Sequence, residues 1–223
     1  IFVYAPSPIT QIFLGYYIKI IKRAKLIIWI QDLWPSVVEK YIHRTLYFFS
    51  YVINFFIKKV LNNSDLILFN KKDYKKNYKK KLKKKNIFYL PNFCDEQKKY
   101  KNKSIDKNKK FKIIYAGNIG RAQSIDTIIK CAKLIKEKNL NKIIFLIYGT
   151  GSKLTYLKYK IKKEKLNNIT LYGYHDPKKM GKIYNSASAL IITLDDNLGL
   201  NLTLPSRLQT FLYYGKPIIG AAN

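Results

Sequence analysis

The stretch YAGNIGRAQS, from Tyr115 to Ser124, decides the fold class of this chain. The apolar residues 111–115 predict a β-strand, which runs into a loop with two glycines, Gly117 and Gly120, and a helical pattern follows from Ser124. Glycine lets a backbone approach a ligand closely and adopt a positive φ. A helix N-terminus behind such a loop presents free N–H groups and a partial positive charge. This strand–loop–helix unit therefore predicts a site for a diphosphate.

The same alternation of apolar strands and helical patterns recurs along the chain. Strands are expected over residues 1–5, 26–30, 66–69, 87–90, 111–115, 143–148, 169–171, 189–194 and 217–219. Helical patterns fill most of the intervals, including residues 11–23 and 36–61 and the segments that start at Asp176-Pro177 and Pro205-Ser206. Asn70 is expected to cap the helix that follows it. Continuous apolar strands between helices are typical of parallel sheets, whose ligands bind at the carboxyl ends of the strands. We therefore expect an α/β protein with two doubly wound halves that face a cleft.

A polar and charged stretch from Pro91 to Lys110 separates the two halves. We assign residues 1–92 to an N-terminal domain, residues 93–110 to a linker and residues 111–223 to a C-terminal domain. The first strand begins at Ile1 without an initiator methionine, and the chain ends just after a strand. On this pattern we expect both domains to be incomplete and the chain to be an internal fragment of a longer enzyme.

Composition excludes a disordered polymer, because 48% of the 223 residues are hydrophobic and can bury a sizeable core. The two cysteines, Cys94 and Cys131, lack metal-ligand spacing and suggest a reducing compartment. The formal net charge of +30 comes from lysines spread along the chain with asparagine, isoleucine and tyrosine, which is typical of a genome-wide bias. A strongly basic surface nevertheless attracts anionic membranes or nucleic acid.

The apolar run LYFFSYVINFFI, residues 46–57, is followed by Lys58 and Lys59. It is too short to span a bilayer, which takes about 20 apolar residues. Aromatic side chains beside lysines suit a helix in the membrane interface, but a helix packed under a sheet is the preferred interpretation.

Glycine and polar residues gather in loops at the expected carboxyl ends of the strands. In the second half these loops are residues 117–123, 149–152, 173–175 and 204–207, and in the first half residues 31–35. Each loop by itself is compatible with a tight turn or a helix cap. Together they predict a nucleotide-binding cleft, because parallel strands place such loops along one rim.

Five segments carry a resemblance to a known family: Asp32–Pro35, Leu90–Asp95, residues 115–129, Tyr148–Ser152 and residues 204–221. They resemble the group 4 retaining glycosyltransferases with the GT-B fold, and most closely the bacterial transferases of capsule, O-antigen and exopolysaccharide assembly. The resemblance covers nearly the whole chain in the family's order. It implies a hexosyltransferase with two Rossmann-like domains, of which the N-terminal one binds the acceptor and the C-terminal one binds a UDP-linked N-acetylated or deoxy sugar.

The resemblance also implies a nucleotide-sugar site. Its contacts are expected from Gly117, Asn118, Gly120, Gln123, Gly149, Gly151, Ser152, Gly173, Tyr174, Ser206, Gln209 and Thr210. The family's basic pair would fall near Asn118 and Gln123, which are neutral here. Arg121 and Arg207 are therefore expected to act as the catalytic cations, since arginine makes bidentate contacts with phosphate. The family's paired glutamates would fall near Leu202 and Thr210, so Gln209, Thr210 or backbone groups are expected to hold the ribose.

Three further side-chain groups have two interpretations each. Asp32 is a catalytic candidate that would position an acceptor or donor hydroxyl, and its alternative is to cap the helix after Pro35. His175 would contact the base or serve the turn before Asp176, and the turn is preferred. The run Asp195-Asp196-Asn197 resembles an acidic metal motif, but the domain pattern fits a fold that works without metal. Neither a metal nor a cofactor is expected.

The expected activity is metal-independent sugar transfer with retention of configuration, from a UDP-sugar to a glycan or lipid-linked acceptor, in cell-surface polysaccharide synthesis. The expected location is the cytoplasm, at the inner face of the membrane, with peripheral contact to anionic lipid and no contact with nucleic acid. The alternatives are a UDP-sugar 2-epimerase of the same fold, a nucleic-acid-binding protein, and a protein that binds nucleotide without transferring sugar.

Overall fold

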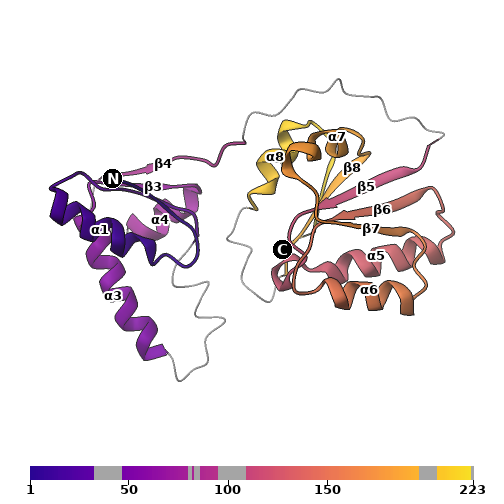
Figure 1. The fold of residues 1–223 in the computed structure, drawn as a ribbon, viewed down its shortest axis with the longest axis horizontal. Helices are drawn as coiled ribbons and strands as arrows, with labels where there is room; N and C mark the ends of the chain where they lie inside the picture. Colours follow the sequence, from indigo (N-terminus) through magenta and orange to yellow (C-terminus); the bar gives the residue numbers. More distant parts are fainter. Residues whose placement is uncertain (33–46, 80–81, 83–85, 95–108, 196–204, 222–223) are drawn as a thin grey trace. The chain divides into compact units, whose positions relative to one another are not determined.

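The structure is a computed structural model, and it describes residues 1–32, 47–79, 82, 86–94, 109–195 and 205–221 (Figure 1). The described residues form two compact units, one within Ile1–Asn92 and one from Phe93 onward. Each unit has its own parallel sheet and its own hydrophobic core.

The first unit is built on a four-stranded sheet with the order β1-β2-β3-β4, in which all neighbouring strands are parallel. Its elements are β1 (Phe2–Ala5), α1 (Gln11–Lys22), β2 (Ile27–Ile30), α3 (Tyr47–Asn63), β3 (Leu66–Phe69), α4 (Lys72–Lys79) and β4 (Ile87–Tyr89). The predicted helix over residues 36–61 is described from Tyr47, and its earlier part lies outside the described residues.

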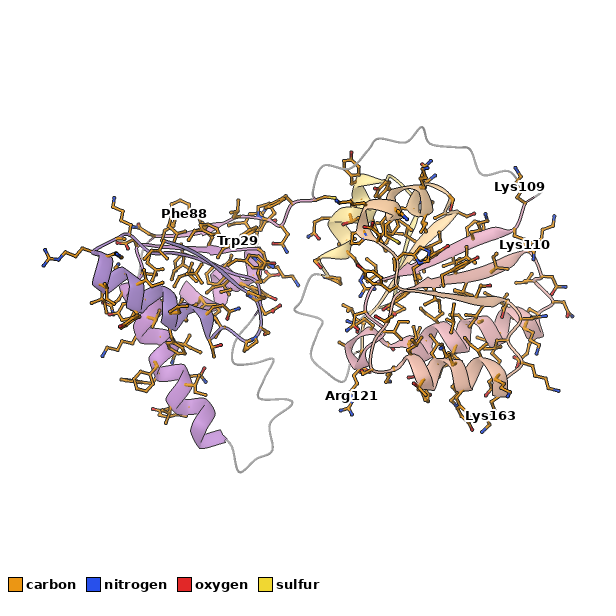
Figure 2. All side chains as sticks on the ribbon, viewed as in Figure 1. Trp29, Phe88, Lys109, Lys110, Arg121 and Lys163 are labelled. Atoms are coloured by element: carbon orange, nitrogen blue, oxygen red, sulfur yellow. The ribbon has the colours of Figure 1, made fainter. Side chains whose placement is uncertain are left out.

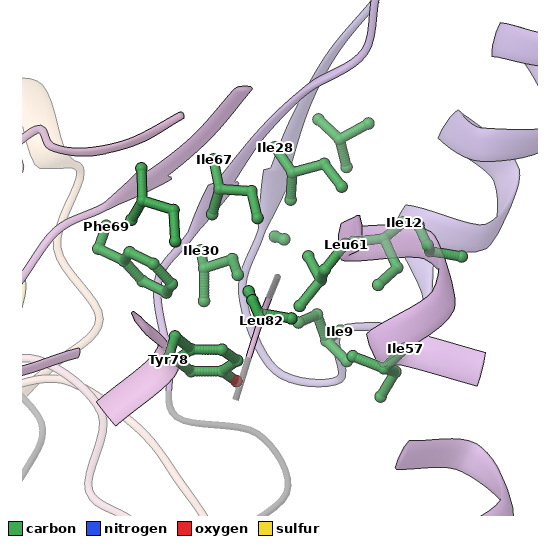
Figure 3. Close-up of a cluster of buried hydrophobic side chains, with 14 of the residues drawn as sticks. Ile9, Ile12, Ile28, Ile30, Ile57, Leu61, Ile67, Phe69, Tyr78 and Leu82 are labelled. Carbon is green, nitrogen blue, oxygen red and sulfur yellow. The ribbon is translucent and has the colours of Figure 1, made fainter. Parts of the chain in front are cut away.

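The core of the first unit lies between one face of this sheet and its helices (Figure 3). Strand residues Ile28, Ile30 and Ile67 meet Ile12 of α1 and Leu61 of α3 there, and all five side chains are buried. β-Branched side chains suit the pleated surface of a strand. Each fully buried side chain of this size contributes about 1.5–3 kcal/mol relative to an exposed one.

Asn70 does not cap α4, contrary to the sequence-based expectation. Its Nδ2 donates to the backbone oxygen and to Oε1 of Gln31, each at 3.0 Å. Its Oδ1, which a cap would use, accepts no hydrogen bond from the described residues. Because Ile30 pairs with Phe69, the residues just after β2 and β3 lie side by side. The Asn70 amide therefore joins the carboxyl ends of two strands.

The second unit has a five-stranded parallel sheet with the order β7-β6-β5-β8-β9. Its elements are β5 (Phe111–Ala116), η2 (Arg121–Gln123), α5 (Ile125–Glu137), β6 (Ile143–Tyr148), α6 (Leu154–Lys163), β7 (Ile169–Gly173), η3 (Pro177–Lys179), α7 (Met180–Asn185), β8 (Ala189–Thr193), α8 (Arg207–Tyr213) and β9 (Ile218–Ala221). The order reverses at β5, so the sheet is doubly wound as predicted.

Helices cover both faces of the second sheet. Figure 1 shows α5 and α6 on one side of it and α7 and α8 on the other. The first pair packs on a core that includes Ile128 and Leu157, and the second pair on a core that includes Met180 and Phe211. All five residues of β8 are buried, as a strand covered on both faces requires. The predicted start at Asp176-Pro177 is confirmed, because Asp176 Oδ1 accepts the Lys178 N–H at 2.9 Å.

None of the helices within the described residues is long and apolar enough to cross a membrane. Residues 95–108 of the predicted linker lie outside the described residues.

Candidate functional site

A pocket of about 840 Å³ lies at the carboxyl ends of β5, β6 and β7 in the second unit. Its lining residues are Phe93, Cys94, Ala116, Gly117, Asn118, Gln123, Tyr148, Gly149, Thr150, Tyr174, His175, Pro177, Met180, Tyr184, Ser206, Arg207 and Thr210. The carboxyl edge of a doubly wound sheet is where such folds bind ligands. Among these described residues Arg207 is the one permanent cation, and none is a carboxylate. The pocket is therefore suited to an anion.

Arg207, the first residue of α8, is held in a fixed position at this pocket. Its Cζ lies 5.0 Å from the centre of the Tyr115 ring. It also packs on the backbone of Gly117, where a Cβ would come within 3.0 Å of Arg207 Cζ. Gly117 has a φ of +138°, so this position requires glycine for both its conformation and its space. Burial raises the pKa of the Tyr115 hydroxyl, while the charge of Arg207 and its contact with that hydroxyl act in the opposite direction.

The guanidinium of Arg207 has hydrogen-bonding capacity that the described protein atoms do not use. Its Nη1 is buried and makes no hydrogen bond within the described part of the chain. A buried donor without a partner costs about 1–3 kcal/mol, and more when it is charged. A bound anion would supply the partner, and a phosphate would do so in the bidentate geometry that arginine favours.

The loops after β5 and β6 pack directly against each other. A Cβ on Gly149 would lie 1.8 Å from the Gly117 carbonyl oxygen, and one on Gly151 would lie 2.4 Å from the Ile119 oxygen. Backbone hydrogen bonds continue beyond the strands, with Gly117 N donating to Tyr148 O at 2.9 Å and Ile119 N donating to Thr150 O at 2.7 Å. The glycines of the second loop thus serve loop-to-loop packing, which fixes the loop that carries Gly117.

Side chains also tie down the loop over residues 117–123. The Tyr115 hydroxyl donates to the Asn118 oxygen at 2.5 Å, and Gly120 N donates to Gln123 Oε1 at 3.2 Å. The Thr193 hydroxyl at the end of β8 donates to the Gln123 oxygen. The loop is therefore preorganised, so little ordering remains to be done when a ligand binds.

Aromatic rings form another wall of the pocket. Tyr148 stacks on Tyr172 with ring centres 4.6 Å apart and planes 5° from parallel, and His175 meets Tyr148 edge-on at 5.0 Å. Tyr174, which also lines the pocket, is 72% exposed. Nδ1 of His175 is buried without a hydrogen-bond partner among the described residues. Burial, and then the neighbouring Tyr172, raises the pKa of Tyr148. Such a wall can stack on a planar base and offers it a polar ring atom.

The structure brings eight of the sequence-predicted contact residues to the pocket: Gly117, Asn118, Gln123, Gly149, Tyr174, Ser206, Arg207 and Thr210. Six others lie outside the lining: Gly120, Arg121, Gly151, Ser152, Gly173 and Gln209. Arg121 opens η2 and is exposed, and Figure 2 shows its side chain projecting away from the ribbon. The geometry thus separates the two arginines that the sequence had grouped together.

Several lining residues were missed in the sequence. The sequence pattern indicates a core position for Tyr148, because this residue ends an apolar strand, and Cys94 falls in the predicted linker. Tyr184 comes from α7, which the sequence did not connect with the pocket. For His175 the turn was preferred, and the structure places its ring in the lining. The signal that was present in the sequence is a polar or aromatic residue directly after a strand, as in Tyr174-His175 after β7.

Asp32 belongs to the first unit, at the carboxyl end of β2. Its Oδ2 accepts the Ser7 N–H at 2.9 Å, which ties the segment after β1 to the end of β2. The start of the predicted helix that Asp32 would cap lies outside the described residues. Of the acidic run after β8, Asp195 is described, and its N–H donates to the Ala122 oxygen at 3.0 Å. Within the described ranges no three His, Cys, Asp or Glu side chains gather as a metal site would require.

Comparison with solved structures shows the fold. TarM of S. aureus, in complex with α-GlcNAc-glycerol and UDP, superposes with a TM-score of 0.61 at 17% identity over 92% of this chain and 39% of its own. HepE of Anabaena, in complex with UDP and glucose, superposes with a TM-score of 0.69 at 13% identity, over 99% of this chain and 59% of its own. The pneumococcal O-GlcNAc transferase GtfA, in complex with UDP and GlcNAc, superposes with a TM-score of 0.61 at 16% identity, over 98% of this chain and 41% of its own. The chain thus spans 39–59% of the length of these three GT-B proteins.

A search of the curated proteins found no match. A family model described as "Glycosyl transferases group 1" matches residues 96–219. This match takes in the loops after β5 and β6, Arg207 and most of the pocket lining, and it covers more than half of the chain. The chain therefore belongs to the group 1 glycosyl transferases and has the GT-B fold.

Proposed function

We propose that this protein transfers a sugar from a UDP-sugar to a glycan or lipid-linked acceptor, with retention of configuration, in cell-surface polysaccharide synthesis. The donor sugar is an N-acetylated or deoxy hexose. The choice of donor rests on Arg207 Nη1, which is buried without a hydrogen-bond partner among the described residues, in a pocket whose described lining has no carboxylate. TarM, HepE and GtfA support the choice of nucleotide, because each was solved with UDP.

The pocket offers one surface for each part of such a donor. The base binds at the aromatic wall of Tyr148 and His175. The diphosphate binds between the preorganised loop that carries Gly117 and the Arg207 guanidinium of α8. Negative charge accumulates on the departing diphosphate as the glycosidic bond breaks. Arg207 would stabilise that charge, and its fixed position on Tyr115 and Gly117 means that it need not reorganise during the reaction.

The reaction would proceed without a metal, with the Arg207 guanidinium providing the positive charge. Turnover should then be unchanged by excess EDTA, measured as release of UDP. Loss of turnover that added Mg²⁺ or Mn²⁺ restores would contradict this part of the proposal.

Asp32 stays a proposal as the residue that positions the acceptor hydroxyl. Its bond to Ser7 N gives it a structural role as well, so Asp32→Asn separates the two. Lower turnover with an unchanged melting temperature would support the catalytic role. A lower melting temperature with unchanged specific activity would leave only the structural one.

Peripheral membrane contact is part of the proposal, because two neighbouring helices of the first unit expose large apolar side chains. Leu14, Tyr17 and Ile21 of α1 are between 56% and 63% exposed, and Tyr51 and Phe55 of α3 are 73% and 61% exposed. The two helices contact each other. Apolar and aromatic side chains near lysines suit the interface of an anionic membrane. Co-sedimentation with vesicles containing phosphatidylglycerol, but not with pure phosphatidylcholine, is the expected result, and equal recovery from both would contradict it.

The decisive experiment is a panel of UDP-sugars tested by thermal shift, followed by NMR analysis of products. Stabilisation by UDP-N-acetylhexosamines or UDP-deoxyhexoses and a new α-glycosidic bond from an α-linked donor are expected. A free epimerised UDP-sugar would instead identify a 2-epimerase, and binding without any transfer would identify a binding-only protein. No shift with any uridine nucleotide would contradict the proposed donor class.

A further inference from the structure

A second pocket, of about 440 Å³, lies in the first unit at the amino ends of β2 and β3. The strands of this sheet are parallel, so the pocket is at the opposite edge from Asp32. Its described lining has three cations and one carboxylate, and we call it the basic pocket. The lining includes Lys19, Ile20, Arg23, Lys25, Asn63 and Asp65.

The negative groups at the basic pocket already have partners. Asp65 Oδ2 accepts Lys19 Nζ at 2.5 Å and the Leu26 N–H at 2.7 Å. The same Lys19 Nζ donates to the Asn63 oxygen at the end of α3, at 2.8 Å. One cation of the pocket is therefore used to hold its one carboxylate.

The other two cations of the basic pocket are not used in this way. Arg23 and Lys25 are exposed, and their side chains make no hydrogen bond or ion pair with other described residues. The turn that presents them is closed, because the Arg23 and Ala24 amides donate to carbonyl oxygens of the last turn of α1. The pocket thus offers two positive charges to an anion, and arginine with lysine is a set suited to phosphate.

The outward face of α1 leads into the basic pocket and is apolar. Leu14, Tyr17 and Ile21 are exposed, and their spacing of three and four residues places them on one face of the helix. Ile20, which is also exposed, lines the pocket itself. A surface helix usually carries polar residues on its outward face. An apolar face that ends at two cations matches the boundary between the acyl chains and the phosphate groups of a bilayer.

We propose that the basic pocket binds the phosphate group of an anionic phospholipid, with Arg23 and Lys25 as its partners. Leu14, Tyr17 and Ile21 then enter the boundary of the acyl chains. This inference deepens the membrane contact of the proposed function and rests on it. It replaces a diffuse attraction by a defined headgroup site, so that lipid binding depends on two side chains more than on the net charge of +30.

The test is co-sedimentation of the whole protein with vesicles of increasing phosphatidylglycerol concentration. Arg23→Gln combined with Lys25→Gln should weaken binding about 30-fold, because each basic side chain at an anionic surface contributes about fivefold. The matched control is Lys158→Gln with Lys162→Gln, which removes two charges from exposed positions of α6. It should have a much smaller effect. Equal weakening by the two pairs would show diffuse attraction and overturn the headgroup site.

A second variant guards against an effect of folding. Arg23 has a φ of +47° and closes the turn after α1, whereas Lys25→Glu leaves this turn intact. Lys25→Glu should weaken vesicle binding by more than fivefold and leave the melting temperature unchanged. Vesicle binding equal to that of the wild type would overturn the headgroup site.

The apolar side of the proposal is tested with Ile21→Gln. This variant should also weaken vesicle binding, whereas Leu134→Gln, at an exposed position of α5, should not. Soluble glycerol phosphate in excess should compete poorly, because it lacks acyl chains. Complete displacement of the protein from vesicles by glycerol phosphate would assign the basic pocket to a free phosphate and overturn the lipid.

The outcomes separate this inference from the proposed function. Binding of UDP should be unchanged in the Arg23 and Lys25 variant, because these residues lie outside the pocket of the second unit. If phosphatidylglycerol is preferred but this variant binds like the wild type, the headgroup site is wrong and the membrane contact stands. Equal recovery with phosphatidylcholine overturns both. If no uridine nucleotide binds but the variant loses vesicle binding, the proposed donor fails and the headgroup site stands.

Discussion

At the residue scale, the role proposed for Arg207 rests on how its guanidinium is held. The guanidinium lies against the Tyr115 ring on one side and the Gly117 backbone on another, with Nη1 buried and unsatisfied among the described residues. Two segments that are far apart in the sequence, one with Tyr115 and Gly117 and one with Arg207, thus hold one cation in a position that suits an anionic ligand.

Replacing Arg207 with alanine should lower turnover by about 10²–10³-fold, the usual cost of removing one preorganised donor at a site of developing charge. The fold should change little, because the variant also removes a buried unsatisfied group. Turnover is measured as sugar transfer, and folding by circular dichroism. Arg207→Lys should recover only part of the loss, since lysine cannot make a bidentate contact.

Arg121→Ala is the matched variant for this test. Arg121 is exposed and lies outside the pocket lining, so its removal should cost far less turnover than removal of Arg207. Equal losses in the two variants would show that both arginines act on the donor, as the sequence pattern suggested.

A series of glycine-to-alanine variants should separate backbone strain from close packing. Gly220→Ala has open space around the new Cβ and should change the free energy of unfolding by at most about 0.5 kcal/mol. Gly173→Ala also has open space but a φ of +70°, and should cost about 1–2 kcal/mol. Gly149→Ala combines a φ of +144° with a contact of 1.8 Å to the Gly117 oxygen, so it should be the most destabilising. Urea unfolding measures the free energy of unfolding of the three variants. A Gly149 variant as stable as the Gly220 variant would contradict the loop packing.

At the scale of elements, α5 and α6 are joined by a small polar cluster around Asp126. Its carboxylate accepts the Tyr156 hydroxyl at 2.5 Å and Lys153 Nζ at 3.1 Å. Burial acts to raise the pKa of Asp126, but these two hydrogen bonds and the charges of Lys153 and Lys160 outweigh it, and the pKa is lowered. The native state therefore favours the ionised carboxylate.

Asp126→Asn should destabilise the protein at neutral pH and have a diminishing effect in acid. Because the pKa is lower in the folded state, the contribution is complete above the ordinary value of 3.8 and is lost as the pH falls through the folded value. The side chain is 39% exposed, so solvent screening limits the effect to about 0.5 kcal/mol. Urea unfolding at pH 7 and near pH 3 measures the loss of unfolding free energy in this variant, and Glu137→Gln on the same helix is the control. A difference that persists undiminished in acid would contradict the ionic origin.

At the scale of the whole molecule, ligand binding should stabilise the second unit through the loops after β5 and β6. UDP at 100 times its dissociation constant should add about 2.7 kcal/mol to the free energy of unfolding of the part that binds it. Hydrogen exchange should then slow at the amides of Gly117 and Gly149 and their neighbours. Slowing confined to the first unit would contradict the location of the pocket.

The net charge of +30 acts on the whole molecule and not on one site. Lysines on α5 and α6 are largely exposed, and several lie over tyrosine rings, as Lys163 does over Tyr159 at 5.7 Å. Such a surface promotes attraction to any polyanion, in a manner that salt weakens. It does not explain the pocket, whose described lining contains one arginine and no lysine.

The sequence by itself determined the fold class, because the alternation of apolar strands and helices is a local pattern that burial imposes on each segment. The β6 bounds, residues 143–148, were predicted as they are found, and the loops after the strands were placed on the right rim. Gly117 and Arg207 could also be predicted as site residues from the sequence, because few other residue types can take the roles of glycine and arginine.

Only the tertiary structure decided which residues share the pocket. Arg121 and Arg207 are equivalent in sequence chemistry, but η2 turns the first outward while α8 brings the second onto Gly117. Cys94 and Thr210 are 116 residues apart and meet only because the chain folds them together. Gly151 belongs to loop packing and not to the lining, which depends on a neighbouring loop that no local pattern reveals. Contacts between distant segments are set by how whole elements pack, and that information is not local to any stretch of sequence.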